Sequence, residues 1–538
     1  MYSLKEPVEN KLQKSSSLSW KFVGRAVVLI ATIAKSASGY SAQYFVDPVA
    51  GNDANAGTAQ VSPWKTIPGM RLTNNSDFLR TNWGAITSAN RIKAGDFIDI
   101  KAGTSMTSTI GGSLLISSTF YDNGTSTLPI TIRVSSTWPA ANGHFTYNAT
   151  GMTPTFNGGT IDILFRDYIK IQGANATRNF RLINSTASNA LQVIGTSSTP
   201  NRGFGLSFSE VAFSPNRGVM LAWANDWIIS NVVSHDHGNL GFDIGGSADQ
   251  VNNNGLISDS EAYAINFTNC ASLGGLCHGF GLYGSTNITF KNCKARNNGR
   301  DGFDFGSVGN NATSTALVVN SASYDNGEDG FGANGSEEQT SKMNTYYYIN
   351  SVAFNNGQAG WDIYEAADVY LLHVIAHHNG NQNGFGGNFM IYSNASGPTT
   401  WTTKVTIRNS IGYKPKTYAN VYSYQANGRP TVIDSDYNIF VPRSSDSETF
   451  AETPYATGFT YTSPPSWKGP HDKVGIAHDP GFTAISTASF AGNNYRLLNT
   501  TGPAINSGLY WNVAPSAILQ DKANINRANP PEIGMYEK

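Results

Sequence analysis

The segment from residue 229 to residue 390 repeats one pattern six times, and this repeat constrains the fold more than any other feature. Each copy contains a short apolar run, a polar residue, a turn of small residues and then Gly-Phe or Gly-Trp. In the first five copies, the residue after the aromatic follows the polar residue by 12 positions, although the copies begin 23 to 38 residues apart. The polar residues are Asn231, Asn269, Asn292, Asn320, Asn350 and His373.

A constant internal offset with variable spacing predicts stacked rungs that carry loop insertions at one place. A single copy cannot bury its apolar face, so each rung must stack on its neighbours, as in a solenoid. Glycines supply the left-handed backbone that tight turns need, and asparagine at a fixed turn position can form a hydrogen-bonded ladder along the stack. The sequence therefore predicts an all-β chain that folds as a right-handed parallel β-helix, a solenoid of stacked rungs.

The two ends of the chain suggest its compartment and its extent. Lys21 and Arg25 flank an apolar run over residues 26–34, and small residues follow, which is typical of a secretory signal. The run is shorter than the roughly 20 residues that span a bilayer. We expect a signal peptide region at residues 1–42 and a single parallel β-helix domain at residues 43–538. The alternative for the apolar run is a buried strand or helix.

Within the domain, we expect core rungs over about 229–440, a long loop over about 441–475 and a closing segment over 476–538. The product would be secreted and extracellular, a monomer with no stable membrane insertion. The formal net charge of −1 gives no global basic field, so we expect no nucleic-acid partner. The three cysteines do not make a disulfide framework. Cys270 and Cys293 are expected to stack as packing thiols, and a bridge between Cys270 and Cys277 is the alternative.

Acidic residues gather in adjacent rungs of the predicted helix. Equivalent positions in successive rungs lie about 4.8 Å apart, so residues of one column are neighbours. Carboxylates this close raise one another's pKa values unless a cation neutralises them. Calcium suits them because it accepts six to eight oxygen ligands in loose geometry. The sequence predicts a Ca²⁺ site at Asp301, Asp304, Glu328 and Asp329, with Asp325 and Asp362 near it; the alternative is a set of solvated acidic turns.

The rungs NGRDGFDFG and NGEDGFGANG, followed by SVAFNNGQAGWD, resemble polysaccharide lyase family nine, which contains β-helix pectate lyases and related enzymes. The resemblance implies that Asp301 and Asp304 match the second and third calcium-binding acids of that family. Arg300 stands at the position of the first acid, and His278 stands near the position of the acid from the preceding rung. Gly332 occupies the place of the family's catalytic lysine, so the base must come from elsewhere.

The resemblance implies calcium-assisted β-elimination on an acidic, uronic-acid-containing polysaccharide. This reaction removes the C5 proton next to a carboxylate, which must be neutralised by a cation or a basic side chain. A base must also reach C5. The candidates are Lys342 in the insertion after Gly332, Arg300 beside the acids, and His278. Nearby acids raise the pKa of an arginine, so Arg300 fits a substrate-carboxylate clamp better than a base.

Further polar residues allow other interpretations. Lys414, Lys416 and Tyr418 belong to a cluster of basic and tyrosine side chains that can bind an anionic sugar chain; the alternative is a surface loop. His235 and His237 flank Asp236 and either bind a metal, perform acid–base chemistry or are polar turn residues. His373 is expected to be structural.

Two rival functions remain open at the level of sequence. A glycoside hydrolase would use a pair of carboxylates drawn from Asp301, Asp304, Asp329 and Asp362. A non-catalytic surface β-helix that binds glycan would need no base, which agrees with the glycine at position 332.

Overall fold

The computed structural model describes most of residues 41–497, together with residues 503–504, 508, 523 and 533–534. The internal gaps are residues 71–89, 139–142, 156, 175–177, 246–250, 266–275, 307–313, 336–343, 365–366, 381–385, 394–402, 417–418, 426–430, 446, 448, 454–455, 461, 463, 487–488 and 490–492. Lys342, Tyr418, Asn269, Cys270 and residues 1–40 of the expected signal peptide region therefore lie outside the described residues. No helix in the described part is long and apolar enough to cross a membrane.

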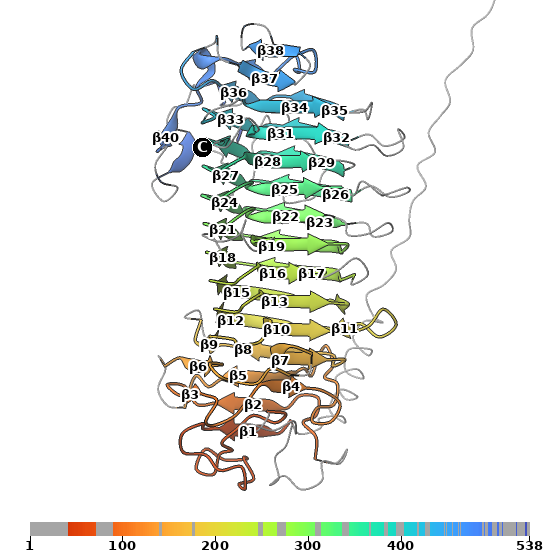
Figure 1. The fold of residues 1–538 in the computed structure, drawn as a ribbon, viewed down its shortest axis with the longest axis vertical. Helices are drawn as coiled ribbons and strands as arrows, with labels where there is room; N and C mark the ends of the chain where they lie inside the picture. The colour runs from red at the N-terminus through yellow and green to blue at the C-terminus, as the bar shows by residue number, and fades with distance from the viewer. Residues whose placement is uncertain are drawn as a thin grey trace, which may run out of the picture. The chain divides into compact units, whose positions relative to one another are not determined.

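The chain coils as a right-handed parallel β-helix, and each rung contributes strands to three stacks (Figure 1). The first stack, here called the front sheet, has thirteen strands and carries the candidate site. Its strands are β4 (Leu114–Ile116), β7 (Gly159–Leu164), β10 (Asn189–Ile194), β13 (Arg217–Ala222), β16 (Leu240–Ile244), β19 (His278–Tyr283), β22 (Phe303–Gly306), β25 (Phe331–Asn334), β28 (Ala359–Tyr364), β31 (Gly387–Ser393), β34 (Val421–Gln425), β37 (Thr449–Thr453) and β38 (Ala456–Thr460).

The second stack follows the loops and turns that leave the front sheet. Its strands are β1 (Gln43–Val46), β2 (Phe97–Ile100), β5 (Ile130–Val134), β8 (Ile169–Gln172), β12 (Gly205–Ala212), β15 (Ile228–His235), β17 (Asn253–Ser258), β20 (Thr286–Lys291), β23 (Thr315–Val319), β26 (Asn344–Ile349), β29 (Ala367–Leu372), β32 (Thr403–Arg408) and β35 (Thr431–Asp436).

The third stack consists of short strands that follow the second stack across a tight bend. Its strands are β3 (Ser105–Met106), β6 (Phe145–Asn148), β9 (Phe180–Ile183), β18 (Glu261–Tyr263), β21 (Lys294–Arg296), β24 (Ala322–Tyr324), β27 (Val352–Phe354), β30 (Ile375–His377), β33 (Ile411–Tyr413), β36 (Ile439–Val441) and β39 (Lys473–Val474). The strands β12 and β15 are long enough to pair in both stacks. The remaining elements are β11 (Asn201–Arg202), β14 (Ala224–Asn225), β40 (Phe482–Ala484), β41 (Asn494–Leu497) and the short 3₁₀ helix η1 (Ile476–His478).

The repeated aromatic residue builds the core behind the front sheet. Successive rings stack nearly parallel along the helix, with centroids 4.7 to 5.6 Å apart. Each buried ring contributes about 1.5–3 kcal/mol by leaving water, so the repeat fixes the register of the rungs. The members are Phe242, Phe280, Phe303, Phe331, Trp361 and Phe389, and all are fully buried.

Because side chains alternate along a strand, the residue after each aromatic points to the outer face of the front sheet. Strand pairing places these residues in one column: Asp243, Gly281, Asp304, Gly332 and Asp362. The column predicted from the constant offset is therefore confirmed.

The bends between the second and third stacks use residues with left-handed backbone. The repeated polar residues adopt φ between 53° and 56°, a region that asparagine and aspartate tolerate better than other non-glycine residues. The described members are Asn231, Asn292, Asn320, Asn350 and His373. A second left-handed residue follows five positions later, at Asp236, Asn297, Asp325, Asn355 and His378.

The main hydrogen-bonded asparagine ladder lies one turn beyond the predicted column. The amides of Asn298, Asn326 and Asn356 each donate to the next amide oxygen along the stack at 2.9 Å, ending at Asn379. All four are buried, and each buried amide needs such partners because leaving it unpaired costs about 1–3 kcal/mol. The predicted column also carries hydrogen bonds, from Asn292 Nδ2 to Asp259 Oδ1 at 2.9 Å and between Asn409 Nδ2 and His373 Nε2 at 3.2 Å, so the predicted ladder is confirmed in part.

The C-terminal rungs differ from their expected form. The segment 441–475, expected to be a long loop, contains β37 and β38, which extend the front sheet and end in an antiparallel pair. Cys277 is disulfide-bonded, which agrees with the alternative of a bridge and not with three unbridged thiols; Cys270 lies outside the described residues. Cys293 is a free, buried cysteine, and burial raises the pKa of its thiol to about 12.

Candidate active site

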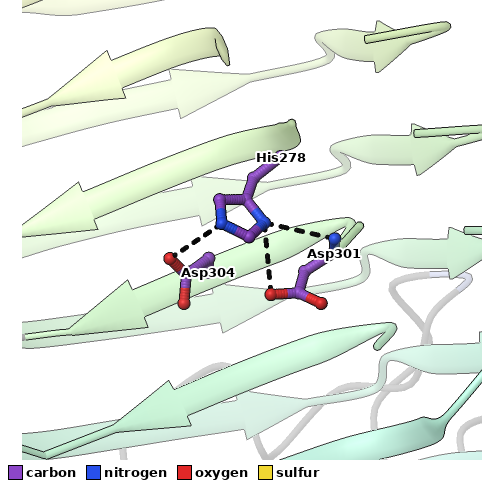
Figure 2. Close-up of side chains that lie close together, drawn as sticks. All are labelled: His278, Asp301 and Asp304. Atoms are coloured by element: carbon purple, nitrogen blue, oxygen red, sulfur yellow. Dashed lines mark hydrogen bonds and ion pairs between the residues drawn. The ribbon is translucent and has the colours of Figure 1, made fainter. Parts of the chain in front are cut away.

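His278, Asp301 and Asp304 meet on the outer face of the front sheet, on two adjacent rungs (Figure 2). His278 begins β19, and the two aspartates lie just before and within β22. Each residue offers one ligand atom, and these atoms lie within 4.8 Å of one another. The imidazole lies between the carboxylates, with Nε2 3.3 Å from Asp304 Oδ2 and Nδ1 3.2 Å from Asp301 Oδ2.

Asp301 contacts His278 Nδ1 through both its backbone and its side chain. The backbone nitrogen and Oδ2 of Asp301 each lie 3.2 Å from Nδ1, while Nε2 faces Asp304. Burial opposes a charged imidazole, but Asp304 and Asp301 outweigh it and raise the pKa of His278. Burial likewise works against the Asp301 carboxylate, but His278 holds the pKa of Asp301 below its usual range. The imidazole and the two carboxylates therefore stabilise one another.

Three donors hold the Asp304 carboxylate. The Tyr283 hydroxyl donates to Oδ2 at 2.7 Å and the Asn334 amide donates to Oδ1 at 2.7 Å, in addition to His278. Gly281 leaves room for the tyrosine ring, since a Cβ there would lie 2.8 Å from Tyr283 Cε2. Burial, and then Asp304, raise the pKa of Tyr283 well above its usual value. Tyr283 therefore stays a hydrogen-bond donor that fixes the orientation of Asp304.

Two further buried carboxylates continue the stack. Asp329 lies on the next rung, where its backbone N–H donates to Asp301 Oδ1 at 2.9 Å, and Asp362 lies one rung beyond in register with Gly332. Asp329 and Asp362 are only 5% and 7% exposed. In each, the buried Oδ1 atom has no hydrogen-bond partner within the described structure. We call Asp301, Asp304, Asp329 and Asp362 the acidic stack.

Like charges within the acidic stack perturb its outer members. Burial, followed by Asp362 and Asp301, raises the pKa of Asp329 well above its usual range. Burial, followed by Asp301 and Asp304, raises the pKa of Asp362 in the same way. Without a cation, these carboxyls are protonated at pH values where an ordinary aspartate is ionised.

The acidic stack meets the chemical requirements of a hard cation. Its donors are carboxylate oxygens, which calcium prefers, and two of these oxygens are buried without a partner among the described residues. His278 supplies the cluster's one imidazole, a group better suited to pairing with the acids than to binding calcium. Among the described residues, the ligand atoms that already lie close enough together to hold one divalent cation belong to His278, Asp301 and Asp304, and Asp329 and Asp362 would extend this group only along the next two rungs.

Arg300 and Glu328 lie at the rim, one position before Asp301 and Asp329 along their rungs. Arg300 Nε donates to Glu328 Oε2 at 2.8 Å, and both side chains are partly exposed. Burial works against the charge, but Glu328 outweighs it and raises the pKa of Arg300, so the guanidinium stays protonated. Glu328, predicted as a calcium ligand, is here the partner of Arg300.

The predicted sugar-binding lysines lie away from the acidic stack. Lys414 follows β33 of the third stack, where Nζ lies 3.4 Å from Asp479 Oδ2 and 4.7 Å from the centre of the Tyr413 ring. Lys416 Nζ donates to Asn355 Oδ1 at 3.4 Å, on the turn after β27. The structure does not bring either lysine to the front sheet.

The His235-Asp236-His237 triplet divides between two environments. His237 is buried between Ser214 and Ser234 at 2.9 and 3.0 Å, and burial lowers the pKa of His237 to about 3. His235 instead faces outward, stacks on Tyr263 with centroids 4.7 Å apart and bonds Asp236 at 2.6 Å. The triplet thus forms no shared metal site within the described structure.

His373 has a structural role. It is buried, and its Nδ1 lies 3.0 Å from the carbonyl oxygen of Gly534, near the end of the chain. This contact ties the closing segment to the turn that follows β29.

Sequence reasoning missed Tyr283 and Asn334, which hold Asp304. Both were available from the same register, because the outward position two residues after the acidic column gives Tyr283, Gly306 and Asn334 in successive rungs. When a column has a large side chain on one rung and glycine on the next, the pattern predicts that the large side chain reaches across to the neighbouring rung.

No protein-family model and no curated protein matches the sequence. Several solved structures are similar in fold. Pectate lyase Pel9A is 16% identical, with 92% of this chain and 96% of that chain covered and a TM-score of 0.49. A rhamnogalacturonan lyase is 16% identical over 74% and 87% of the two chains, with a TM-score of 0.43. The A-module of the Azotobacter vinelandii mannuronan C-5 epimerase AlgE6 is 15% identical over 68% and 88%, with a TM-score of 0.48.

Proposed function

We propose that this chain is a secreted polysaccharide lyase that cleaves a uronic-acid polymer by β-elimination with the help of Ca²⁺. The observation that supports this most is the acidic stack: four buried carboxylates on one face, two of which retain an unpartnered buried oxygen. Secretion rests on the charged and apolar pattern of residues 21–39.

The residues of the acidic stack would hold the cation, and His278, Tyr283 and Asn334 would keep Asp301 and Asp304 oriented for it. A bound Ca²⁺ would supply the positive charge that neutralises the substrate carboxylate and makes the C5 proton acidic. Buried like-charged carboxylates are unfavourable by themselves, so a cation is the simplest reason for a fold to keep them together.

The three candidate bases occupy different environments. His278 is buried, with Nδ1 facing Asp301 and Nε2 facing Asp304, so we assign it to orienting the carboxylates. Arg300 is a protonated guanidinium at the rim, and we assign it to binding the substrate carboxylate. Lys342 remains the proposed base, from its place in the insertion that follows Gly332.

Ultraviolet absorbance of the C4–C5 double bond tests the proposal. The mature protein is incubated with polygalacturonate, alginate and other uronic-acid polymers, with Ca²⁺ or with chelator. A lyase gives rising absorbance on at least one polymer with Ca²⁺ and none with chelator. Absorbance that is insensitive to chelator would contradict the role of the cation, and no absorbance on any polymer would contradict the lyase.

A glycoside hydrolase is the second candidate, because neighbouring carboxyls have pKa values shifted in opposite directions. The pKa of Asp301 is lowered and the pKa of Asp329 is raised, and such a difference separates a carboxylate from a general acid. A hydrolase would release reducing ends without a double bond. A reducing-end assay on the same samples therefore separates the two enzymes.

A further inference from the structure

A second charged group lies on the same outer face, on the N-terminal side of the acidic stack. Arg217 begins β13 and Asp243 lies in β16, with Arg217 Nε 2.5 Å from Asp243 Oδ2. Asp243 is 1% exposed, whereas the Arg217 side chain is 22% exposed. The buried carboxylate therefore contacts the inner side of the guanidinium, while part of the Arg217 side chain is exposed at the surface.

The terminal amino groups of Arg217 are not engaged by oxygen. Nη1 contacts the Met220 sulfur at 3.9 Å, and Nη2 has no partner among the described residues. Nε and Asp243 Oδ2 form a close ion pair without hydrogen-bond geometry, and the guanidinium beside it still has donors that can match the two oxygens of a carboxylate. Since Asp243 fixes the orientation beforehand, less side-chain entropy is lost when an anion binds.

A hydrogen-bond acceptor lies on the neighbouring rung, in register with Arg217. Asn189 pairs with Arg217 across β10 and β13 and is 6% exposed. Its Nδ2 donates to Gln192 Oε1 at 2.8 Å, while its Oδ1 is buried without a hydrogen-bond partner in the described structure. Gln192 is itself fixed, because its Nε2 donates to the carbonyl oxygen of Asn157 at 3.0 Å. An acceptor without a hydrogen-bond partner therefore lies on the rung next to that of Arg217.

A uronic acid offers the complementary groups, a carboxylate for the arginine and a hydroxyl for the asparagine. Arg217 and Asp301 belong to rungs three steps apart, from β13 through β16 and β19 to β22 (Figure 1). Three steps of about 4.8 Å amount to about 14 Å, more than one sugar ring spans. The two groups would thus contact different sugars of a polymer lying along the helix.

We propose that Arg217, oriented by Asp243 and accompanied by Asn189, forms a subsite for the carboxylate of a uronic acid other than the one that is cleaved. This inference rests on the proposed function, in that it takes the substrate to be an acidic polysaccharide. Arg217 then determines specificity: a neutral sugar leaves its donors unmatched, and an unmatched polar group weakens binding more than a lost apolar contact does.

Affinity electrophoresis in native gels that contain a polymer tests the subsite without relying on turnover. The gels contain polygalacturonate or alginate, and parallel gels contain the carboxyl-reduced form of each. Replacing Arg217 alone would remove the cation that lies beside the buried Asp243 carboxylate, which endangers folding. The test variant is therefore R217Q/D243N, which removes both charges. R217K keeps the positive charge but cannot donate two parallel hydrogen bonds to one carboxylate.

The matched control is R296Q/E261Q, which removes an equivalent pair from the outer face of the third stack, where Arg296 Nε lies 2.6 Å from Glu261 Oε1. We expect the wild type and this control to be retarded by an acidic polymer and not by its reduced form. R217Q/D243N should lose retardation about tenfold or more, as expected when a charge-assisted bidentate contact is removed. R217K should fall between the two. Circular dichroism and melting curves establish that each variant is folded.

Three results would overturn the subsite: equal retardation of R217Q/D243N and the wild type, equal retardation by the acidic and reduced polymers, or no retardation of the wild type by any acidic polymer. The double-bond assay distinguishes this inference from the proposed function. Arg217-dependent retardation without double-bond formation would support the subsite and reject the lyase. If R217Q/D243N forms the double bond as fast as the wild type at low substrate concentration, the result would support the lyase and reject the subsite.

Discussion

The front sheet and the third stack both carry charged columns on their outer faces, but they arrange the charges differently. On the third stack, opposite charges form pairs: Arg181 pairs with Glu210 at 2.8 Å, and Arg296 pairs with Glu261 at 2.6 Å. On the front sheet, the acidic stack places like charges on successive rungs and buries them. Pairs of opposite charge stabilise a stack of rungs, whereas repeated like charges are unfavourable and need a ligand.

The same rung geometry therefore produces a structural ladder on one face and a candidate site on the other. Partially exposed pairs such as Arg181–Glu210 contribute only about 0–1 kcal/mol, so the third stack can lose one without much effect. Buried carboxylates are different, because removing one changes both the repulsion and the capacity to bind a cation. Substitutions on each face test this contrast, and those in the acidic stack should have the greater consequences.

Replacing Asp304 by asparagine should abolish most activity, because the acidic stack then lacks the carboxylate that three donors orient. We expect the rate of double-bond formation to fall on the order of a hundredfold to a thousandfold, the scale of losing one key electrostatic group. The control is Asp325→Asn, on the turn before β25. An asparagine there adopts the same left-handed backbone and still accepts from Asn355. Equal activities in the two variants would remove Asp304 from the site.

Replacing Tyr283 by phenylalanine removes one donor from Asp304 and leaves the ring in its slot. We expect a decrease in activity of about 10- to 100-fold, as for other groups that orient metal ligands, with weaker calcium binding. Tyr147→Phe is the control, since it deletes a buried hydroxyl that donates to the Gly112 carbonyl oxygen far from the acidic stack. Unchanged calcium affinity in Tyr283→Phe would reject its role in orienting Asp304.

Replacing Asp329 by asparagine should change stability in opposite directions with and without calcium. In chelator, the variant should be more stable than the wild type by on the order of 1 kcal/mol, because a like charge is removed. With saturating calcium, the order should reverse, because binding stabilises the wild type more. Urea denaturation in both conditions measures this. A variant that is less stable in both conditions would indicate an ordinary structural aspartate.

Replacing Glu210 by glutamine should give the smallest effect, and one that depends on pH. His235 and then Arg181 lower the pKa of Glu210 to about 2, although burial opposes them. A depressed folded pKa stabilises the fold above the ordinary glutamate pKa, and this contribution is lost as pH falls towards 2. At neutral pH, the variant should be less stable by about 1 kcal/mol, and the difference should shrink on acidification. A difference that is independent of pH would contradict the ion-pair explanation.

Much of the fold could be predicted from the sequence because the rungs repeat. The constant offset between polar and aromatic residues predicts a column in which Asp304 lies between Gly281 and Gly332, and strand pairing shows the same column. The position of the asparagine ladder could not be found in this way. Two asparagine columns run along the helix, one before and one after the third stack, and only the three-dimensional structure shows that the second forms the longer continuous ladder.

The details of the site were less predictable, because they depend on side chains that reach across rungs. Glu328 was expected to join the acids, but it extends to Arg300 at the rim. Tyr283 reaches Asp304 only because glycine at position 281 leaves space beside it. The significance of Arg217 appears only when Asp243 is seen to hold one side of its guanidinium. Columns read from the sequence show which residues are neighbours, but they do not show which of these neighbours a long side chain contacts.

Calcium titration of the metal-free protein by calorimetry tests the central claim most directly. If the acidic stack is a cation site, the wild type and Asp325→Asn bind one Ca²⁺ with equal affinity, and Asp329→Asn binds it far more weakly. If the wild type binds no calcium, or if Asp329→Asn binds it as tightly as the wild type does, the buried like charges of the front sheet do not form that site.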